Sequence, residues 1–213
     1  MSKRKLAISL VVLFVSTVGL YIYAAYDDWF GQPRGIGEIQ GEERSDILIK
    51  KLAAEQAAIA RGMNETPDKQ ILFGDLHVHT TFSTDAFLWS LPIYGGEGAH
   101  PLADACDYAR HCSALDFWSI TDHAEVATPK RWEQTKQSIR ACNAVSSNGD
   151  NPDMVSFIGF EWTQVGQLPE DHFGHKNVIF KGLEDAELAK RPIASGGVAV
   201  NALRTNGKDL IPL

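Results

Sequence analysis

The chain contains 213 residues, of which 44% are hydrophobic and 22% are charged. This composition excludes disordered and fibrous classes and is typical of one globular domain. Asp and Glu number 27 against 20 Lys and Arg, giving a net charge of −7, and residues 1–26 contain three basic residues and no acid. The remainder is therefore strongly acidic. Because nucleic-acid binding depends on Lys and Arg neutralising phosphates, this charge argues against a nucleic-acid partner.

The first 26 residues are predicted to associate with a membrane. Residues 6–26 are uncharged, and as a helix they would span about 30 Å, the thickness of a bilayer core. Three basic residues precede this stretch and two aspartates follow it. The positive-inside bias therefore predicts a single-pass cytoplasmic-membrane (inner-membrane) protein, with its remainder on the periplasmic or extracellular side. A cleaved signal peptide is the alternative, which the bulky Ile22 and Tyr23 near any cut disfavour.

Residues 27–69 are predicted to form a linker and an amphipathic helix. Gly and Pro are frequent up to Gly37, and a helix is expected from Ser45 to about Arg61. Ser45 can cap the first amides of this helix, and Gly62 can end it. The domain that carries the chemistry is expected to occupy residues 70–213.

The three cysteines do not indicate a disulfide framework. Cys106 and Cys112 are six residues apart in one predicted helix, so their side chains point in different directions, and the number of cysteines is odd. We therefore expect buried free thiols.

The pattern from residue 70 onward predicts an α/β fold. Short apolar runs, typical of strands, alternate with helical stretches. The expected strands are 71–78, 116–121, 155–160 and 177–180, and the expected helices are 101–112 and 128–145.

Polar residues follow these strands where each one ends. Two-residue alternation places Asp75, His77 and His79 on one face of the first strand. His123 follows the second strand, and Glu161 follows the third. In α/β barrels, the carboxyl ends of the strands assemble the chemistry. We therefore expect these side chains to converge.

Imidazoles and a carboxylate in this arrangement predict a metal site. Neutral imidazole is the commonest ligand for transition metals, and a buried carboxylate such as Glu161 needs a cation. Asp122 and Asp75 could orient the ligand imidazoles, or they could be solvated loop carboxylates. His100 and His111 are expected to have no role in the site.

The motifs DLHVHTTFSTD, SITDHAE and IGFEW resemble the first three motifs of the PHP (polymerase and histidinol phosphatase) superfamily. The wider match, which continues to GHKNVIF, resembles the branch filed as domain of unknown function 3604 (DUF3604) and covers about residues 70–182. The resemblance implies a distorted (β/α)7 barrel, of which this chain would be the amino-terminal part.

The resemblance also implies a set of side chains that bind two or three divalent metal ions. These ions would be Zn, Mn or Fe. His77 and His79 would hold one ion and Glu161 would bridge it to a second, which His175 would bind. Asp85 and His123 would serve a third ion. The strand-end argument does not predict His175, and His172 is its competitor.

The sequence departs from the PHP pattern near its end. No histidine follows His175, whereas PHP enzymes add another histidine and a late Asp-x-His. The chain ends after about four predicted strands, so we expect a truncated reading frame and an impaired metal site.

The expected function is metal-dependent hydrolysis, most simply of small phosphorylated or other anionic esters by a metal-activated hydroxide. His77, His79, Glu161 and Asp122 are the residues expected to support it. An amidohydrolase-like amide or ester hydrolase is one alternative, although such barrels usually present a bridging lysine where this chain has Glu161. A non-catalytic, membrane-tethered metal-binding or vestigial domain is the other.

Overall fold

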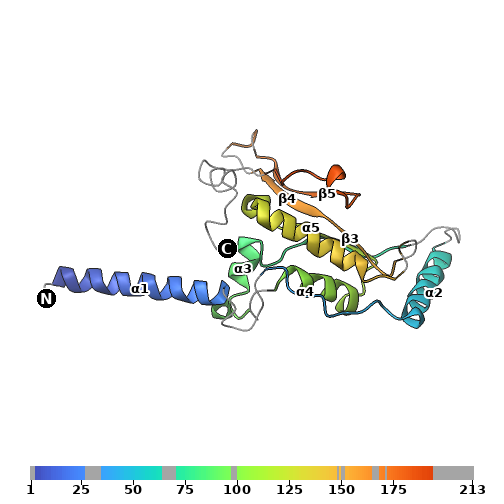
Figure 1. Ribbon diagram of the computed structural model, residues 1–213, viewed down its shortest axis with the longest axis horizontal. Helices are drawn as coiled ribbons and strands as arrows, with labels where there is room; N and C mark the ends of the chain where they lie inside the picture. The colour runs from blue at the N-terminus through green and yellow to red at the C-terminus, as the bar shows by residue number, and fades with distance from the viewer. Residues whose placement is uncertain are drawn as a thin grey trace.

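The computed structural model describes residues 3–26, 35–63, 71–96, 100–147, 149, 152–164, 168–170 and 172–193. The predicted loop at residues 64–68 and the end of the chain from residue 194 lie outside these ranges. One long helix, α1 (Lys3–Tyr26), extends from a body that contains all the other elements (Figure 1).

Helix α1 is long and apolar enough to cross a membrane, and a signal sequence at this end of the chain would meet the same description. Its side chains are exposed over residues 3–20. The prediction of one apolar amino-terminal helix is confirmed. The side of the membrane on which the body lies stays a prediction.

The segment between α1 and the chemistry is bonded to the body. The amide of Ala103 donates to the Ile36 carbonyl over 2.8 Å, and the amides of Gln40 and Gly41 donate to Asp107 over 2.8 and 3.0 Å. Helix α2 (Asp46–Gly62) follows, and the side chain of its N-cap Ser45 accepts from an amide in the first turn. The predicted helix is confirmed, and it includes Gly62.

The predicted βα order is present as a parallel sheet. Strands β1 (Gly74–Val78), β2 (Phe117–Ile120) and β3 (Val155–Phe157) lie in the order β1-β2-β3. Helix α4 (Leu102–Asp107) continues as a π-helical turn (Tyr108–Cys112), and α5 (Pro129–Ala144) contacts both α4 and β3. The short helix α3 (Thr84–Trp89) and the 3₁₀ turn η1 (Pro92–Tyr94) lie between β1 and α4.

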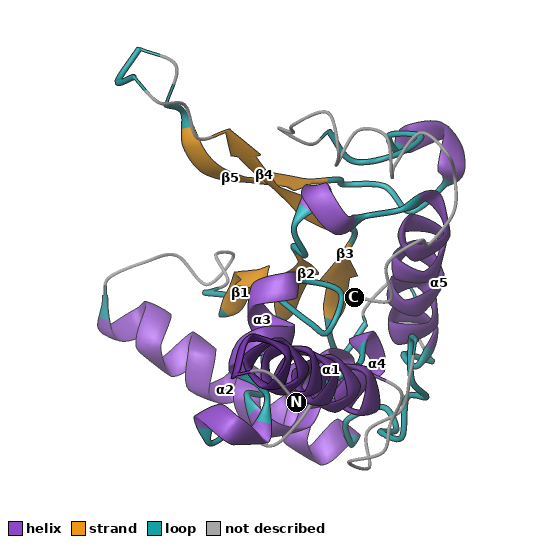
Figure 2. Cartoon of the chain, turned by 90° about the vertical axis from the view of Figure 1, so that its left-hand side faces the viewer, coloured by secondary structure: helices purple, strands orange, loops and turns teal. Residues whose placement is uncertain are grey.

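The third predicted strand, 155–160, is divided in the structure. It breaks at Ile158, and β4 (Gly159–Gln164) then pairs antiparallel with β5 (Gly174–Ile179). A side chain at position 159 would lie 2.8 Å from the carbonyl oxygens of Ile120 and Val178, so a glycine allows β5 to pass close by. The β4–β5 hairpin projects beyond the parallel sheet (Figure 2). Glu161 therefore lies within a strand and not after one.

The core of the body lies between the sheet and helices α4 and α5. Trp118 and Ile120 of β2 are completely buried, as are Leu102 of α4 and Ile139 of α5. Burial of these apolar side chains gives the sheet one closed face.

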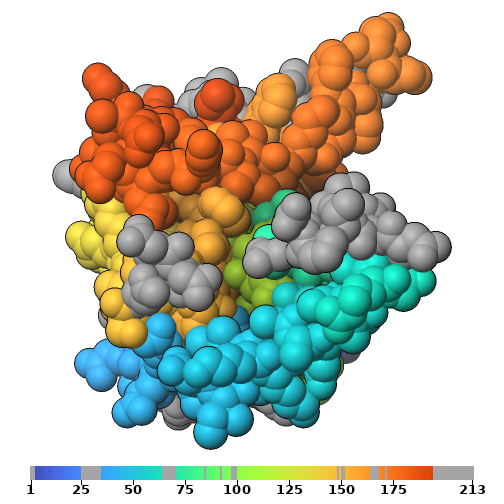
Figure 3. Space-filling model, turned by 90° about the vertical axis from the view of Figure 1, so that its right-hand side faces the viewer, coloured from blue at the N-terminus to red at the C-terminus, as the bar shows by residue number. Residues whose placement is uncertain are grey.

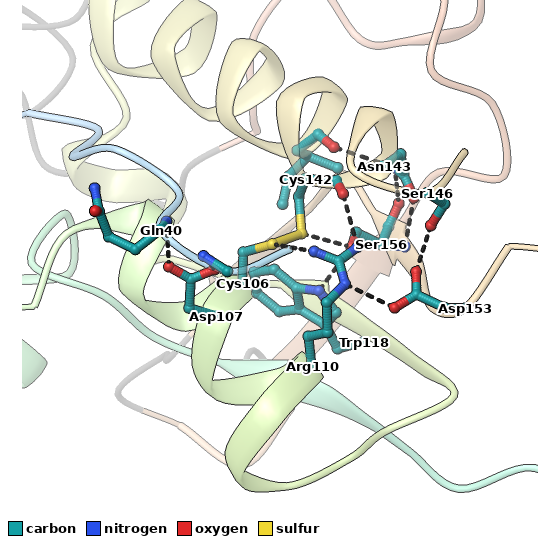
Figure 4. The surroundings of a disulfide bond; sticks show 12 residues. Gln40, Cys106, Asp107, Arg110, Trp118, Cys142, Asn143, Ser146, Asp153 and Ser156 are labelled. Carbon is teal, nitrogen blue, oxygen red and sulfur yellow. Dashed lines mark hydrogen bonds and ion pairs between the residues drawn. A yellow bond between two sulfur atoms is a disulfide. The ribbon is translucent and has the colours of Figure 1, made fainter. Parts of the chain in front are cut away.

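A disulfide joins α4 to α5, so the expectation of buried free thiols was wrong. Cys106 is bonded to Cys142, 36 residues later (Figure 4). The remaining Cys112 is free and exposed. The prediction considered two cysteines of one helix, whereas the bonded pair lies on two helices that pack together.

A buried ion pair lies beside this disulfide (Figure 4). The Arg110 guanidinium donates to Asp153 over 3.0 Å and to the Cys142 carbonyl over 2.9 Å, and the Arg44 amide donates to Asp153 over 3.1 Å. Burial alone would raise the pKa of Asp153, but the Ser146 hydroxyl, the Arg44 amide and the Arg110 charge lower it. The carboxylate thus joins the segment before α2, the α4 region and the start of β3.

We predict that the double substitution Cys106→Ser with Cys142→Ser lowers the free energy of unfolding. The bond closes a loop of 36 residues, and losing that constraint on the unfolded chain costs about 3–4 kcal/mol. Urea unfolding followed by circular dichroism measures the change. The matched control, Cys112→Ser, should change stability by less than about 0.5 kcal/mol. Equal effects of the two replacements would contradict this prediction.

Candidate metal centre

The structure brings together the six side chains that were predicted as metal ligands. They come from the end of β1, from α3, from the loop after β2 and from the β4–β5 hairpin. They form three groups whose ligand atoms lie within 4.8 Å of one another: His77, His79 and Glu161; His79, Asp85 and His123; His123, Glu161 and His175. Neighbouring groups share a member, so the groups form one continuous cluster.

Glu161 lies at the centre of this cluster and is only 3% exposed. One of its oxygens, Oε2, lies 3.0 Å from Nε2 of His79 and 3.2 Å from Nε2 of His77. The other oxygen, Oε1, contacts Nδ1 of His175. His123 is more distant, with Nδ1 3.7 Å from Oε2. A single carboxylate thus lies near four imidazoles, which come from three places in the chain.

The backbone explains why these residues meet. Strands β1 and β2 are parallel and adjacent, so His79 and His123 follow neighbouring strand ends, and their ring centroids are 4.9 Å apart. The amide of Glu161 donates to the Asp122 carbonyl over 3.1 Å, which places β4 beside the loop after β2. His175 lies on β5, opposite Thr163 of β4. The hairpin therefore delivers both Glu161 and His175.

Asp85 reaches the cluster from the first turn of α3. Its Oδ2 lies 3.1 Å from Nε2 of His123, and its Oδ1 lies 4.0 Å from Nδ1 of His79. Partial burial would raise the pKa of Asp85, but the Ala86 amide and the His123 ring outweigh it, so the pKa is lowered. The side chain is therefore a carboxylate at neutral pH, which is the form that binds metal ions.

Asp122 is buried, and it acts on the cluster through Ser83 and not through the neighbouring His123 ring. It accepts from the amide and the hydroxyl of Thr80, each over 2.7 Å, and from the Ser83 hydroxyl over 2.8 Å. Burial raises its pKa. Asp75, by contrast, accepts from the backbone amide of His77 over 2.9 Å.

Ser83 determines which nitrogen of His79 carries the proton. Because the Ser83 hydroxyl donates to Asp122, its oxygen must accept from its other neighbours. These are the His123 amide, at 2.9 Å, and Nδ1 of His79, at 2.8 Å. We therefore assign the proton of His79 to Nδ1. Its Nε2 is left with a lone pair that faces Glu161.

This arrangement leaves two acceptors facing each other. Burial lowers the pKa of His79, which favours the neutral ring. Burial would raise the pKa of Glu161, but His123 and the hydrogen bonds from His77 and His175 lower it. The lone pair of Nε2 therefore lies 3.0 Å from a carboxylate oxygen. Two acceptors at this distance repel unless a cation lies between them or beside them, so the residues fit a bound metal ion.

Thr163 belongs to the cluster and was missed in the sequence. Its hydroxyl lies 2.9 Å from Nδ1 of His175 and 3.4 Å from Oε1 of Glu161. It lies two residues after Glu161 in β4, so two-residue alternation along the strand could have identified it. Ser83 was also missed, although it is part of the DLHVHTTFSTD motif.

A cavity of about 520 Å³ opens beside His77 and His79. It is lined by residues of β1 and α4 and by His100, Tyr108 and Trp118 among others. His100 pairs with Asp104 at 3.3 Å and is not part of the three groups. His111 and His172, both described and exposed, are also outside them. The cavity is large enough for a small molecule.

The comparison with protein families supports the DUF3604 branch for part of the chain. The family model described as "Protein of unknown function (DUF3604)" matches residues 66–138. This range includes His77, His79, Asp85 and His123 but ends before Glu161. Comparisons with curated proteins and with solved structures gave no match.

We predict that ligand substitutions remove metal in proportion to the groups they disrupt. Glu161 belongs to two of the three groups, whereas His77 belongs to one. After loading with excess Zn or Mn and desalting, Glu161→Gln should retain less metal than His77→Ala, and both should retain less than the unaltered chain. Inductively coupled plasma mass spectrometry measures the amount of bound metal per chain.

The matched control for these variants is His100→Ala, which removes a histidine paired with an acid outside the cluster. It should bind as much metal as the unaltered chain. Metal retention by Glu161→Gln at the level of His100→Ala would contradict the assignment of the cluster.

We also predict that Ser83→Ala weakens metal binding although Ser83 is not a ligand. Without the hydroxyl, His79 loses the acceptor that fixes its proton on Nδ1, and loss of such a partner weakens metal affinity about 10–100-fold. Ser90→Ala is the control, because the Ser90 hydroxyl donates only to a carbonyl in its own helix. Competition with a fluorescent chelator measures both affinities, and equal affinities would show that Ser83 has no orienting role.

Proposed function

We propose that this chain forms a metal-dependent hydrolase domain that acts on small phosphorylated or other anionic esters. The observation that carries the proposal is the distance of 3.0 Å between the buried carboxylate of Glu161 and Nε2 of His79, a nitrogen that we assign as unprotonated because Ser83 accepts from Nδ1. The four imidazoles and two carboxylates of the cluster are nitrogen and oxygen donors that suit Zn, Mn or Fe.

Each group of the cluster would hold one ion. His77 would bind the first, His175 the second and Asp85 the third, and His79, His123 and Glu161 each belong to two of the groups. Bound divalent ions supply Lewis acidity and bring the pKa of water towards neutrality. Glu161 and Asp85 contribute the negative charge that keeps the ions in place.

The other residues of the centre orient the ligands. The Thr80 hydroxyl donates to Asp122, the Ser83 hydroxyl donates to the same carboxylate, and Ser83 holds His79 with its Nε2 free for an ion. Because the Ser83 hydroxyl is engaged by Asp122, it is a poor candidate for a nucleophile. Water is the nucleophile that this arrangement supports.

The cavity beside His77 and His79 would receive the substrate. Among its lining residues, all in the described part of the chain, there is no Lys or Arg. Attraction of an anionic substrate would therefore depend on the ions and not on basic side chains. A phosphate ester would gain more from such ions than a neutral amide or carbon ester, because its negative charge would be attracted to them.

The same reasoning extends to the fold and the location. Three parallel strands with ligands near their carboxyl ends fit the amino-terminal part of a distorted (β/α)7 barrel of the PHP type. The disulfide between Cys106 and Cys142 supports a periplasmic or extracellular domain, because cytoplasmic thiols are kept reduced.

The test compares two esters on the metal-loaded full chain in detergent. We expect hydrolysis of an aryl phosphate and not of an aryl acetate. His77→Ala should reduce the phosphatase rate to the background of the metal-free protein, because it disrupts the group nearest the cavity. His100→Ala, whose residue also lines the cavity, should keep its metal and its response to added metal.

The other outcomes identify the alternatives. Hydrolysis of the acetate alone would favour an amidohydrolase-like ester or amide hydrolase. Bound metal with no turnover of either ester would favour a non-catalytic metal-binding domain. Either result would overturn the phosphoesterase proposal.

A further inference from the structure

Four large apolar side chains are exposed along one edge of the body, which we call the α3 edge: Leu88, Trp89, Ile93 and Tyr94. Ile93 is 72% exposed and Trp89 is 69% exposed. The rings of Trp89 and Tyr94 contact each other, with centroids 5.3 Å apart. Single exposed apolar residues are common, but a group of this kind marks an interaction site.

The α3 edge lies beside the end of α1. The amide of Ile93 donates to the Tyr21 hydroxyl over 3.3 Å, and Figure 1 shows α3 beside the end of α1 that adjoins the body. Ala24 is buried, and Tyr21 and Ile22 are half-buried, whereas residues 3–20 are exposed. The last turns of α1 therefore pack on the body, and the rest of the helix projects from it.

The contact between Ile93 and Tyr21 indicates how deep the α3 edge would lie in a bilayer that α1 spans. Tyr21 lies five residues before the end of α1, which is about 8 Å along a helix. In a helix that spans a membrane, Tyr and Trp near the end occupy the boundary between the acyl chains and the headgroups. Because Ile93 contacts Tyr21, Ile93 lies at the level of this boundary. Trp89 and Tyr94 are of the residue types that this layer favours.

The chain between α1 and the body limits how far the body can move from the membrane. Eight residues separate Tyr26 from Gly35, and a chain of this length reaches at most about 30 Å. From Gly35 onward the chain is bonded to the body through Ile36, Gln40 and Gly41. The body thus stays near the surface that α1 enters.

The lack of basic residues at the α3 edge indicates which kind of lipid contact it can make. No Lys or Arg occurs between Lys69 and Arg110, so the edge offers no basic residues to anionic headgroups. A contact made by Trp, Tyr, Ile and Leu depends on burial of apolar area. Such a contact forms on zwitterionic lipids and is insensitive to salt.

We propose that the α3 edge docks into the interfacial layer of the bilayer that α1 spans. The occupant of the exposed apolar surface is therefore lipid, and the contact gives the body a fixed face towards the membrane. Asp85 lies on the same helix as Trp89, four residues earlier. Docking would therefore place the candidate metal centre close to the membrane surface, whether or not the centre is catalytic.

The test uses a polarity-sensitive probe on the full chain in phosphatidylcholine nanodiscs. Cys112→Ala removes the free thiol, and Cys106 and Cys142 are bonded to each other. In this background, Ile93→Cys or Ile47→Cys is labelled with a nitrobenzoxadiazole fluorophore. Ile47 is the matched control, because it is 82% exposed and lies on α2, on the opposite side of the body from α1 (Figure 1).

We expect lipids that carry a nitroxide at the top of the acyl chain to quench the probe at residue 93 several-fold more than the probe at residue 47. The emission of the probe at residue 93 should also shift to shorter wavelength. Both effects should persist at high salt. Equal quenching at the two positions, quenching only at residue 47, or loss of quenching at high salt would overturn the proposal.

A second set of variants separates docking from mere proximity to α1. Trp89→Ser combined with Tyr94→Ser should reduce quenching of the probe at residue 93 several-fold, whereas Leu48→Ser on α2 should not. These side chains are exposed, so the fold should persist, and circular dichroism checks it. Unchanged quenching in the double variant would show that α1 alone holds residue 93 at the bilayer, and it would overturn the proposed docking.

Discussion

The candidate metal centre depends on one chain of hydrogen bonds that fixes the proton of His79. Asp122 is buried and accepts the hydrogen bond of the Ser83 hydroxyl, so the Ser83 oxygen can only accept from His79. The lone pair of His79 Nε2 is thereby turned towards Glu161, 3.0 Å away. Burying a carboxylate against another acceptor costs free energy that a cation recovers. His77, His123 and His175 lie around the same carboxylate. Each adds a ring nitrogen that could bind a cation next to Glu161.

The two ends of the parallel sheet have different physical tasks. At the carboxyl ends of the strands, the imidazoles and carboxylates of the cluster face one another. Their negative charge is one that a bound cation would balance. Near the start of β3, the Asp153 carboxylate is well supplied with hydrogen bonds: it accepts from Arg44, Arg110 and Ser146. A disulfide joins the two helices beside it. Rigid packing at one end allows the other end to hold residues that would repel without a cation. This division matches the general rule that parallel α/β sheets bind ligands beyond the carboxyl ends of their strands.

Local pattern allowed the strands to be predicted and placed His77, His79, His123 and Glu161 near strand ends, whereas Asp85 and His175 were expected only from the resemblance to PHP proteins. Apolar runs with helices between them set the strand order, and two-residue alternation placed His77 beside His79. The β4–β5 hairpin was not predicted, since it depends on the close approach that Gly159 permits. The Cys106–Cys142 bond and the role of Ser83 were missed for the same reason: each requires the relative position of elements far apart in the chain. The family match to residues 66–138 likewise ends before Glu161, and only the fold joins the two parts of the centre.

Helix α3 connects the metal centre to the surface of the molecule within six residues. Asp85, at its start, approaches His123 at 3.1 Å; Phe87, in its middle, is buried; Leu88 and Trp89, at its end, are exposed beside α1. A helix this short has little stability of its own, so its position is set by what its two ends contact. A displacement of Leu88 and Trp89 would therefore also displace Asp85, which lies in the same short helix. Docking of the α3 edge on lipid would therefore set the orientation of the centre and steady one of its ligands.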